Sequence, residues 1–184
     1  VCSIIGIFGV IFGIDVISTT AQENLKQQRE DLIGFIWKGN DGKIPTRLPD
    51  SVEFGISDKN FGNLQNLKKI DRITVEMKYG VNSIAYLLHP TEQTHNDLII
   101  YHNGHGDYLH EGEKQIRFFL DRGYSVLVFS MPLTGMNSEP TITIDNKEIK
   151  FTSHDDFRFL GSDEFAPFSY FVEPIAVSLN FIDA

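Results

Sequence analysis

The first 18 residues of the chain are almost wholly apolar, and Asp15 is their only charged residue. An amphipathic helix of a soluble domain would carry a polar face, which this run lacks. The pattern is typical of the hydrophobic part of a secretory signal, with Thr19 and Ala21 as small residues near a cleavage site, or of a single membrane anchor. A buried strand or helix is the third interpretation. We therefore set residues 1–21 apart as a signal peptide or membrane anchor.

Residues 22–70 form a mostly polar segment that predicts one helix followed by loops. A helix is expected over residues 21–37, because several apolar side chains fall near one helical face. These side chains are Leu25, Leu32, Ile33 and Ile36. Glycine, asparagine and proline interrupt both regular periods over residues 39–49, which predicts a loop. Residues 51–69 follow neither period clearly, and their structure is left open.

Alternating apolar and polar residues predict an antiparallel hairpin at the start of the remaining segment, residues 71–184. Residues 71–79 alternate with the period of a half-exposed strand. A turn at residues 80–82 leads to a partner strand at residues 83–88.

Two continuous apolar runs, at residues 98–101 and 125–129, predict strands that are buried on both faces of a sheet. Residues 108–122 between them predict a helix, with Asp107 as its N-cap and Gly123 as the left-handed residue that ends it. The inward stripe of this helix consists of Ile116, Phe119 and Leu120. A strand, helix and strand of this length form a right-handed crossover with parallel strands. The predicted fold class is therefore α/β.

Two further elements follow the second buried strand. Residues 141–151 alternate on either side of Asp145 and Asn146, which predicts a small hairpin. Apolar residues at helical spacing predict a helix over residues 167–184, with a local disturbance at Pro174. The polar residues 153–156 between these elements predict a loop.

Composition and charge exclude some classes of partner. The chain has 184 residues and a formal net charge of -9, which argues against binding to nucleic acid, because such binding needs a basic face to neutralise phosphate. Cys2 is the only cysteine, which excludes an intrachain disulfide and a cysteine-based zinc site. The sequence contains no dinucleotide-binding or P-loop glycine motif, and we predict no cofactor.

The loop at residues 102–107, with the sequence H-N-G-H-G-D, carries the most unusual chemistry of the chain. It follows the first buried strand, and parallel sheets bind ligands beyond the carboxyl ends of their strands. Residues 130–132 lie at the second such end. Gly104 and Gly106 would let backbone N–H groups approach a ligand, and the helix N-terminus that follows adds partial positive charge. The loop therefore predicts a site that stabilises an anionic oxygen, as an oxyanion hole does.

A metal site is a competing hypothesis for the same loop. The side chains of His102, His105, Asp107, His110 and Glu111 are of types that bind zinc or another divalent cation. However, His102 and His105 stand three residues apart in a glycine-containing turn, whereas a helix would hold ligands four residues apart on one side. We favour solvent-facing or supporting roles for His102 and His110 and predict no metal.

The order of these elements resembles the first half of an α/β-hydrolase, over residues 71–184. In that family an H-G-x-G loop follows the third strand and donates one oxyanion-hole N–H, and the fourth strand runs R-G-Y-x-V and ends in D-x-x-G-x-G-x-S. Arg122, Gly123, Tyr124 and Val126 match the fourth-strand motif. The resemblance implies that the oxyanion-hole loop consists of Asn103, Gly104, His105 and Gly106, with the N–H of His105 as donor. Asn103 replaces the usual histidine, and Ser130 stands where an aspartate is common.

The resemblance also implies that the catalytic residues lie beyond Ala184. The chain contains no G-x-S-x-G nucleophile elbow, and in this fold the acid and the histidine follow the nucleophile. His154, beside Asp155 and Asp156, comes too early for such a role. The helix at residues 167–184 then resembles the helix that precedes the nucleophile strand. We expect the N-terminal part of a serine hydrolase for small ester or peptide-like substrates, inactive by itself.

A non-catalytic, surface-anchored binding protein with an α/β-hydrolase-like fold is the alternative. A signal peptide or anchor at residues 1–18 would make the domain either secreted or attached to a membrane.

Overall fold

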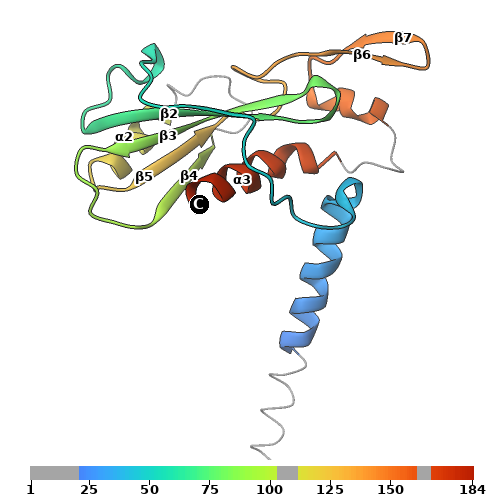
Figure 1. Ribbon diagram of the computed structural model, residues 1–184, viewed down its shortest axis with the longest axis horizontal. Helices are drawn as coiled ribbons and strands as arrows, with labels where there is room; N and C mark the ends of the chain where they lie inside the picture. The colour runs from blue at the N-terminus through green and yellow to red at the C-terminus, as the bar shows by residue number, and fades with distance from the viewer. Residues whose placement is uncertain (1–20, 103–111, 161–166) are drawn as a thin grey trace, which may run out of the picture. The chain divides into compact units, whose positions relative to one another are not determined.

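The computed structural model describes residues 21–102, 112–160 and 167–184 (Figure 1). The chain divides into two compact units, Val1–Ile44 and Pro45–Ala184. In the first unit, residues 21–36 form a helix, which confirms the prediction, and the short 3₁₀ helix η1 (Lys38–Asn40) follows. Residues 1–20, where a signal or anchor is predicted, lie outside the described part of the chain. In the described part, no helix is long and apolar enough to cross a membrane.

Within the described residues, the second unit contains a five-stranded mixed sheet in the order β1-β2-β3-β5-β4 (Figure 1). Its strands are β1 (Ser51–Glu53), β2 (Leu67–Glu76), β3 (Asn82–Pro90), β4 (Leu98–His102) and β5 (Ser125–Phe129). β2 pairs antiparallel with both β1 and β3, and β3 pairs antiparallel with β5. β4 and β5 are parallel. The predicted hairpin and the predicted parallel pair are therefore confirmed, and the fold is mixed α/β.

The β2–β3 hairpin is longer than the sequence pattern indicated. β2 begins at Leu67, after the short 3₁₀ helix η2 (Lys59–Phe61). Its first residues therefore lie within residues 51–69, for which the sequence pattern predicts no element. The chain reverses at η3 (Lys78–Gly80), where Tyr79 and Gly80 have φ values of 61° and 73°. Tyr79 therefore belongs to the turn, although alternation placed it in the strand. Alternation cannot distinguish the last strand residue from a turn residue with the same polarity.

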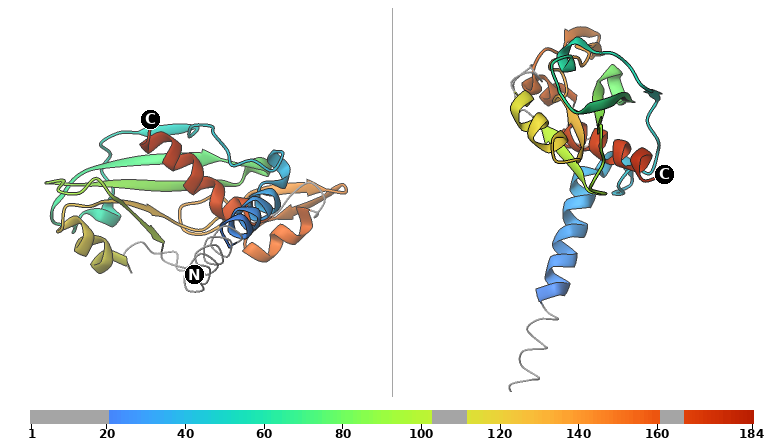
Figure 2. Two further views of the ribbon diagram at one scale, coloured as in Figure 1. Left: turned by 90° about the horizontal axis from the view of Figure 1, so that it is seen from below. Right: turned by 90° about the vertical axis from the view of Figure 1, so that its left-hand side faces the viewer.

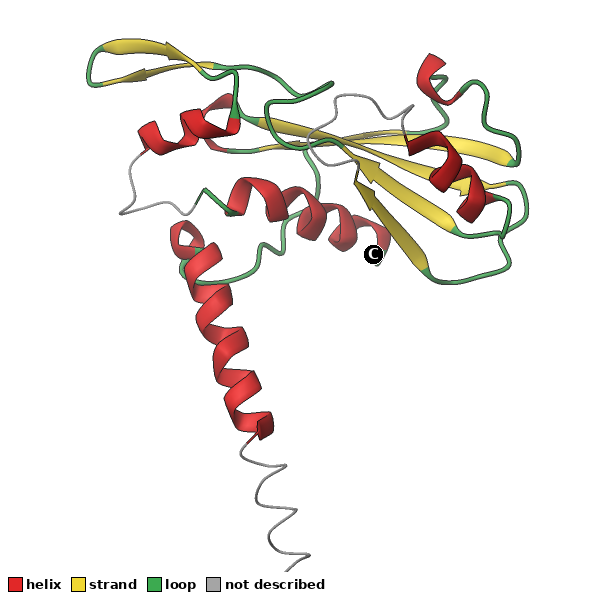
Figure 3. Ribbon diagram, turned by 180° about the vertical axis from the view of Figure 1, so that it is seen from behind, coloured by secondary structure: helices red, strands yellow, loops and turns green. Residues whose placement is uncertain are grey.

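The helices α2 (Glu113–Leu120) and α3 (Ser169–Ile182) cover opposite faces of the sheet (Figures 2 and 3). Ile116 and Leu120 of α2 pack with β3 and β5 on one face, as the predicted stripe requires. Val177 of α3 packs with β2, β3 and β5 on the other face. All five residues of β5 are buried between these layers. α2 ends at Leu120, two residues before the predicted end at residue 122, and Gly123 follows three residues after Leu120 with φ 77°, which confirms its predicted left-handed conformation.

One burial prediction is wrong. β4 is not buried on both faces, because Ile100 is 43% exposed. β4 lies at the edge of the sheet, and among the described residues no strand pairs with its outer side. Phe168, which precedes α3, and Leu179 within it are exposed, so the buried side of α3 lies elsewhere on the helix. It contains Ser169, Tyr170, Pro174, Val177 and Ser178.

An excursion between β5 and α3 contains the predicted hairpin, with strands β6 (Thr141–Ile144) and β7 (Lys147–Lys150). Asp145 and Asn146 form its turn with φ values of 50° and 59°. The 3₁₀ helix η5 (His154–Leu160) follows, so the prediction of a loop at residues 153–156 is only partly right. A separate apolar cluster holds the excursion on the domain. Its buried members are Val81, Leu133, Ile142, Phe151, Phe157 and Tyr170.

Candidate functional site at the carboxyl ends of β4 and β5

The parallel pairing of β4 and β5 brings the two predicted site loops to one end of the sheet. His102, the last residue of β4, pairs with Phe129, the last residue of β5, and their ring centroids lie 5.3 Å apart. Both strands therefore end at the same edge of the sheet. Ser130, which follows Phe129, is the first residue of the second loop at that edge. The predicted oxyanion-hole residues lie outside the described part of the chain. They are Asn103, Gly104, His105 and Gly106.

The described residues on either side of the first loop contact each other. The ring of Tyr101 lies against Gly112, which precedes α2, so that a Cβ on Gly112 would lie 2.5 Å from the Cζ of Tyr101. A side chain at residue 112 would therefore displace the phenol. The absence of a Cβ lets the end of β4 and the start of α2 approach closely, and the loop between them begins and ends at this contact.

The second loop, residues 130–138, is tied to β3 by the side chain of Asn137. Its Oδ1 accepts a hydrogen bond of 2.8 Å from the N–H of Ile84, and its Nδ2 donates to the carbonyl oxygens of Met131 at 2.6 Å and Ser130 at 3.3 Å. Ser138 continues the attachment, because its N–H donates to Oδ1 of Asn82 at 2.7 Å. These contacts give the exit of β5 a fixed course.

The backbone of the second loop contains two left-handed residues. Leu133 has φ 59° and Gly135 has φ 61°. The Leu133 side chain is 3% exposed and belongs to the apolar cluster that holds the excursion. His154 reaches the same loop, since its Nε2 donates to the carbonyl oxygen of Pro132 at 2.7 Å. His154 therefore supports the loop, and its ring packs edge-on against Phe171.

The structure does not test the metal hypothesis. Of its five candidate ligands, only His102 belongs to the described residues, and the other four lie outside them. Among the residues that the structure describes, no group of three or more histidine, cysteine, aspartate or glutamate side chains could hold a metal ion.

The sequence patterns did not predict an ionic cluster on β2 and β3, which surrounds the buried carboxylate of Asp71. Asp71 is 2% exposed, and its Oδ2 accepts hydrogen bonds of 2.8 Å from both His89 Nε2 and Lys69 Nζ. Its Oδ1 accepts from the N–H of Gly55 at 2.9 Å. Burial acts to raise the pKa of Asp71, but the hydrogen bonds from Lys69, Gly55 and His89 together lower it below the usual range. The cluster spans β2 and β3, and β5 lies between it and β4 in the sheet. The hydrogen bond from Gly55 fixes the chain before η2 onto the sheet.

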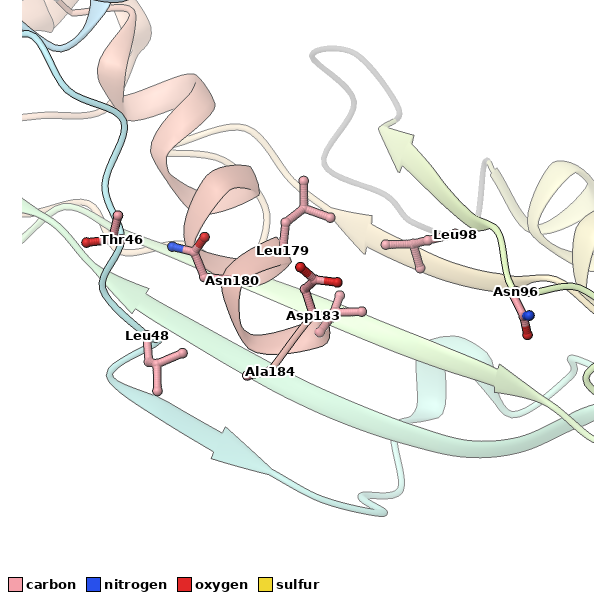
Figure 4. Close-up of a pocket in the computed structure, with 9 residues that line it drawn as sticks. Thr46, Leu48, Asn96, Leu98, Leu179, Asn180, Asp183 and Ala184 are labelled. Carbon is pink, nitrogen blue, oxygen red and sulfur yellow. The ribbon is translucent and has the colours of Figure 1, made fainter.

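A concavity of about 570 Å³ lies at the opposite, amino end of β4 (Figure 4). Leu98, the first residue of β4, lines it together with Leu179 and Ile182 of α3. Ala184 lines the same concavity. Ala184 and the first residue of β4 therefore lie on the same concavity.

Comparison of the chain with protein-family models, with curated proteins and with solved structures finds no significant match.

Proposed function

We propose that this chain is the N-terminal part of a serine hydrolase with an α/β-hydrolase fold, and that it holds the carbonyl of a small ester or peptide-like substrate. The observation that carries the proposal is the strand order β1-β2-β3-β5-β4. The antiparallel hairpin of β2 and β3 is followed by the parallel pair of β4 and β5. β5 lies between β3 and β4 in the sheet, although it follows β4 in the sequence. In this proposal, β4 and β5 correspond to the third and fourth strands of the α/β-hydrolase family.

The outer edge of β4 supports the same proposal. In the α/β-hydrolase family a fifth strand pairs with the third strand. The corresponding place here is the outer edge of β4, where Ile100 is 43% exposed. Ala184 lines the same concavity as Leu98, the first residue of β4. A strand that followed α3 from this point could run parallel to β4 and complete a second right-handed crossover.

The backbone of the second loop offers further support. With Ser130 at the aspartate position of the D-x-x-G-x-G-x-S motif, the two glycine positions fall on Leu133 and Gly135. Both residues have the left-handed φ that glycine adopts without strain. Asn137 then occupies the serine position of the motif.

The proposed chemistry divides the work between this chain and the residues after Ala184. A serine in a later nucleophile elbow attacks the substrate carbonyl, and the acid and histidine that activate it also follow. The N–H of His105, in the loop of Asn103 to Gly106, stabilises the resulting oxyanion. The chain alone is inactive in this proposal. Residues 1–18 would attach the protein to a membrane or direct its secretion.

The complete coding sequence tests the proposal. We expect a G-x-S-x-G pentapeptide within about 30 residues of Ala184, which is the length of one strand-helix unit. The intact protein should then hydrolyse short-chain p-nitrophenyl esters. A complete sequence without such a pentapeptide would reject the enzyme and leave the non-catalytic, surface-anchored binding protein.

A further inference from the structure

The side chain of Asn137 fills the place where β3 and β5 separate. The two strands remain paired as far as Phe129, and the next backbone N–H of β3, from Ile84, donates to Oδ1 of Asn137 at 2.8 Å. The Nδ2 of Asn137 donates to the carbonyl oxygens of Met131 at 2.6 Å and Ser130 at 3.3 Å. One side-chain amide, 7% exposed, therefore replaces the next backbone pair and determines where the chain goes after β5.

The carbonyl groups of Met131 and Pro132 accept hydrogen bonds from further donors. The Met131 oxygen also accepts hydrogen bonds from the N–H and Oγ1 of Thr134, at 3.2 and 2.8 Å. The Pro132 oxygen accepts from Nε2 of His154 at 2.7 Å. Leu133 comes next, with φ 59°, a conformation that leucine rarely adopts. Such a backbone persists only where its surroundings impose it, and such residues concentrate at functional sites.

We propose that Asn137 is a positioning residue of the carbonyl-binding end of the sheet. It fixes Ser130 and Met131, the first two residues after β5, whose last residue Phe129 pairs with His102 at the end of β4. This inference rests on the proposed hydrolase function. Because a displacement of about 1 Å in a catalytic site can reduce the rate about 100-fold, a change in the course of this loop is expected to lower kcat.

Asn180 provides a matched control. Its Nδ2 also donates to two backbone carbonyl oxygens, those of Pro45 at 2.9 Å and Arg47 at 3.0 Å. Asn180 lies on α3 and lines the concavity at the amino end of β4, away from the exits of β4 and β5. In both Asn137→Asp and Asn180→Asp a carboxylate oxygen replaces the amide donor. The carboxylate then lies against two backbone carbonyl oxygens, and their repulsion is expected to lower the stability of each variant.

The experiment compares these variants in the intact protein by kcat and KM for a short-chain p-nitrophenyl ester, and by Tm. We expect Asn137→Asp to lower kcat at least tenfold with KM within about twofold, whereas Asn180→Asp lowers Tm by a similar amount and keeps kcat. If Asn137→Asp does not fold, Asn137→Ser removes the same donor without adding charge and carries the same expectation.

Each outcome leads to one conclusion. Equal kcat values for the Asn137 and Asn180 variants, or a change in KM alone, would overturn the role of Asn137 and leave the hydrolase proposal intact. A wild-type protein that neither hydrolyses the ester nor reacts with a fluorophosphonate would reject the hydrolase proposal, and the inference would fall with it.

Discussion

Replacement of Gly123 by alanine is expected to reduce the free energy of unfolding by about 3 kcal/mol. Gly123 has φ 77°, and a Cβ at this residue would lie 2.8 Å from both the carbonyl oxygen of Glu92 and the backbone nitrogen of Thr94. A left-handed alanine costs about 1–2 kcal/mol. Overpacking against backbone atoms adds about 1–3 kcal/mol.

The neighbouring segment cannot move away from such a Cβ without losing its own contacts. The N–H of Thr94 donates to the carbonyl oxygen of Gly123 at 3.2 Å, and Oγ1 of Thr94 donates to that of Arg122 at 2.9 Å. For a chain of about 150–250 residues, a loss of about 3 kcal/mol corresponds to a decrease in Tm of about 6–12 °C, and the shift is smaller for a longer intact protein.

The assay is thermal unfolding of the intact protein, followed by circular dichroism, with Gly62→Ala as the matched control. Gly62 has φ -62°, and the nearest atom to its added Cβ is the carbonyl oxygen of Lys59 at 3.6 Å. This control should change the free energy of unfolding by no more than about 0.5 kcal/mol. Gly123→Asn tolerates the left-handed backbone but keeps the Cβ, so it should fall between wild type and Gly123→Ala. Equal effects of the two alanine variants, or full recovery with asparagine, would refute the reasoning.

Three further predictions concern the ionic contacts and the sheet edge. Because the pKa of Asp71 is lowered in the folded state, its ionised form stabilises the fold above about pH 4, and this contribution is lost as the pH falls through the lower folded pKa. The stability deficit of Asp71→Asn in urea should therefore shrink below pH 4, and a constant deficit from pH 3 to 7 would contradict this. A double-mutant cycle on Arg47 and Glu173, which are 3.0 Å apart, should give a coupling of about 1 kcal/mol that decreases in 1 M salt; no coupling would show that the pair is not stabilising. Residues 22–184, expressed alone, should aggregate or stay partly unfolded because no described strand pairs with the outer edge of β4, and a monodisperse monomer with cooperative melting would argue against this.

Local patterns predicted those elements whose structure depends on neighbouring residues in the sequence. The run at 125–129 became β5 with the same bounds, and Gly123 has the expected left-handed φ in the turn between α2 and β5, because a buried strand and a turn glycine are encoded by a few adjacent residues. The burial of β4 was overestimated, since an apolar run does not reveal whether a second neighbouring strand is present. Ile100 is exposed for that reason.

The side chains that fix the candidate site were not predictable from local patterns. Asn137 bonds to Ile84, which is 53 residues away, and nothing near Asn137 in the sequence indicates that partner. Asp71 similarly looked like the first residue of a half-exposed strand, although the fold buries it beside His89 and Lys69. Both cases depend on which strands become neighbours, and only the folded chain provides that information.

Labelling of the intact protein with a fluorophosphonate tests the central proposal most directly. Such a reagent reacts covalently with an activated serine, and mass spectrometry of the resulting peptides locates the modified residue. We predict a single labelled serine, C-terminal to Ala184 and within a G-x-S-x-G sequence. A labelled serine among residues 1–184, or no labelling of the folded intact protein, would contradict the proposal that this chain holds the carbonyl for a nucleophile that follows it.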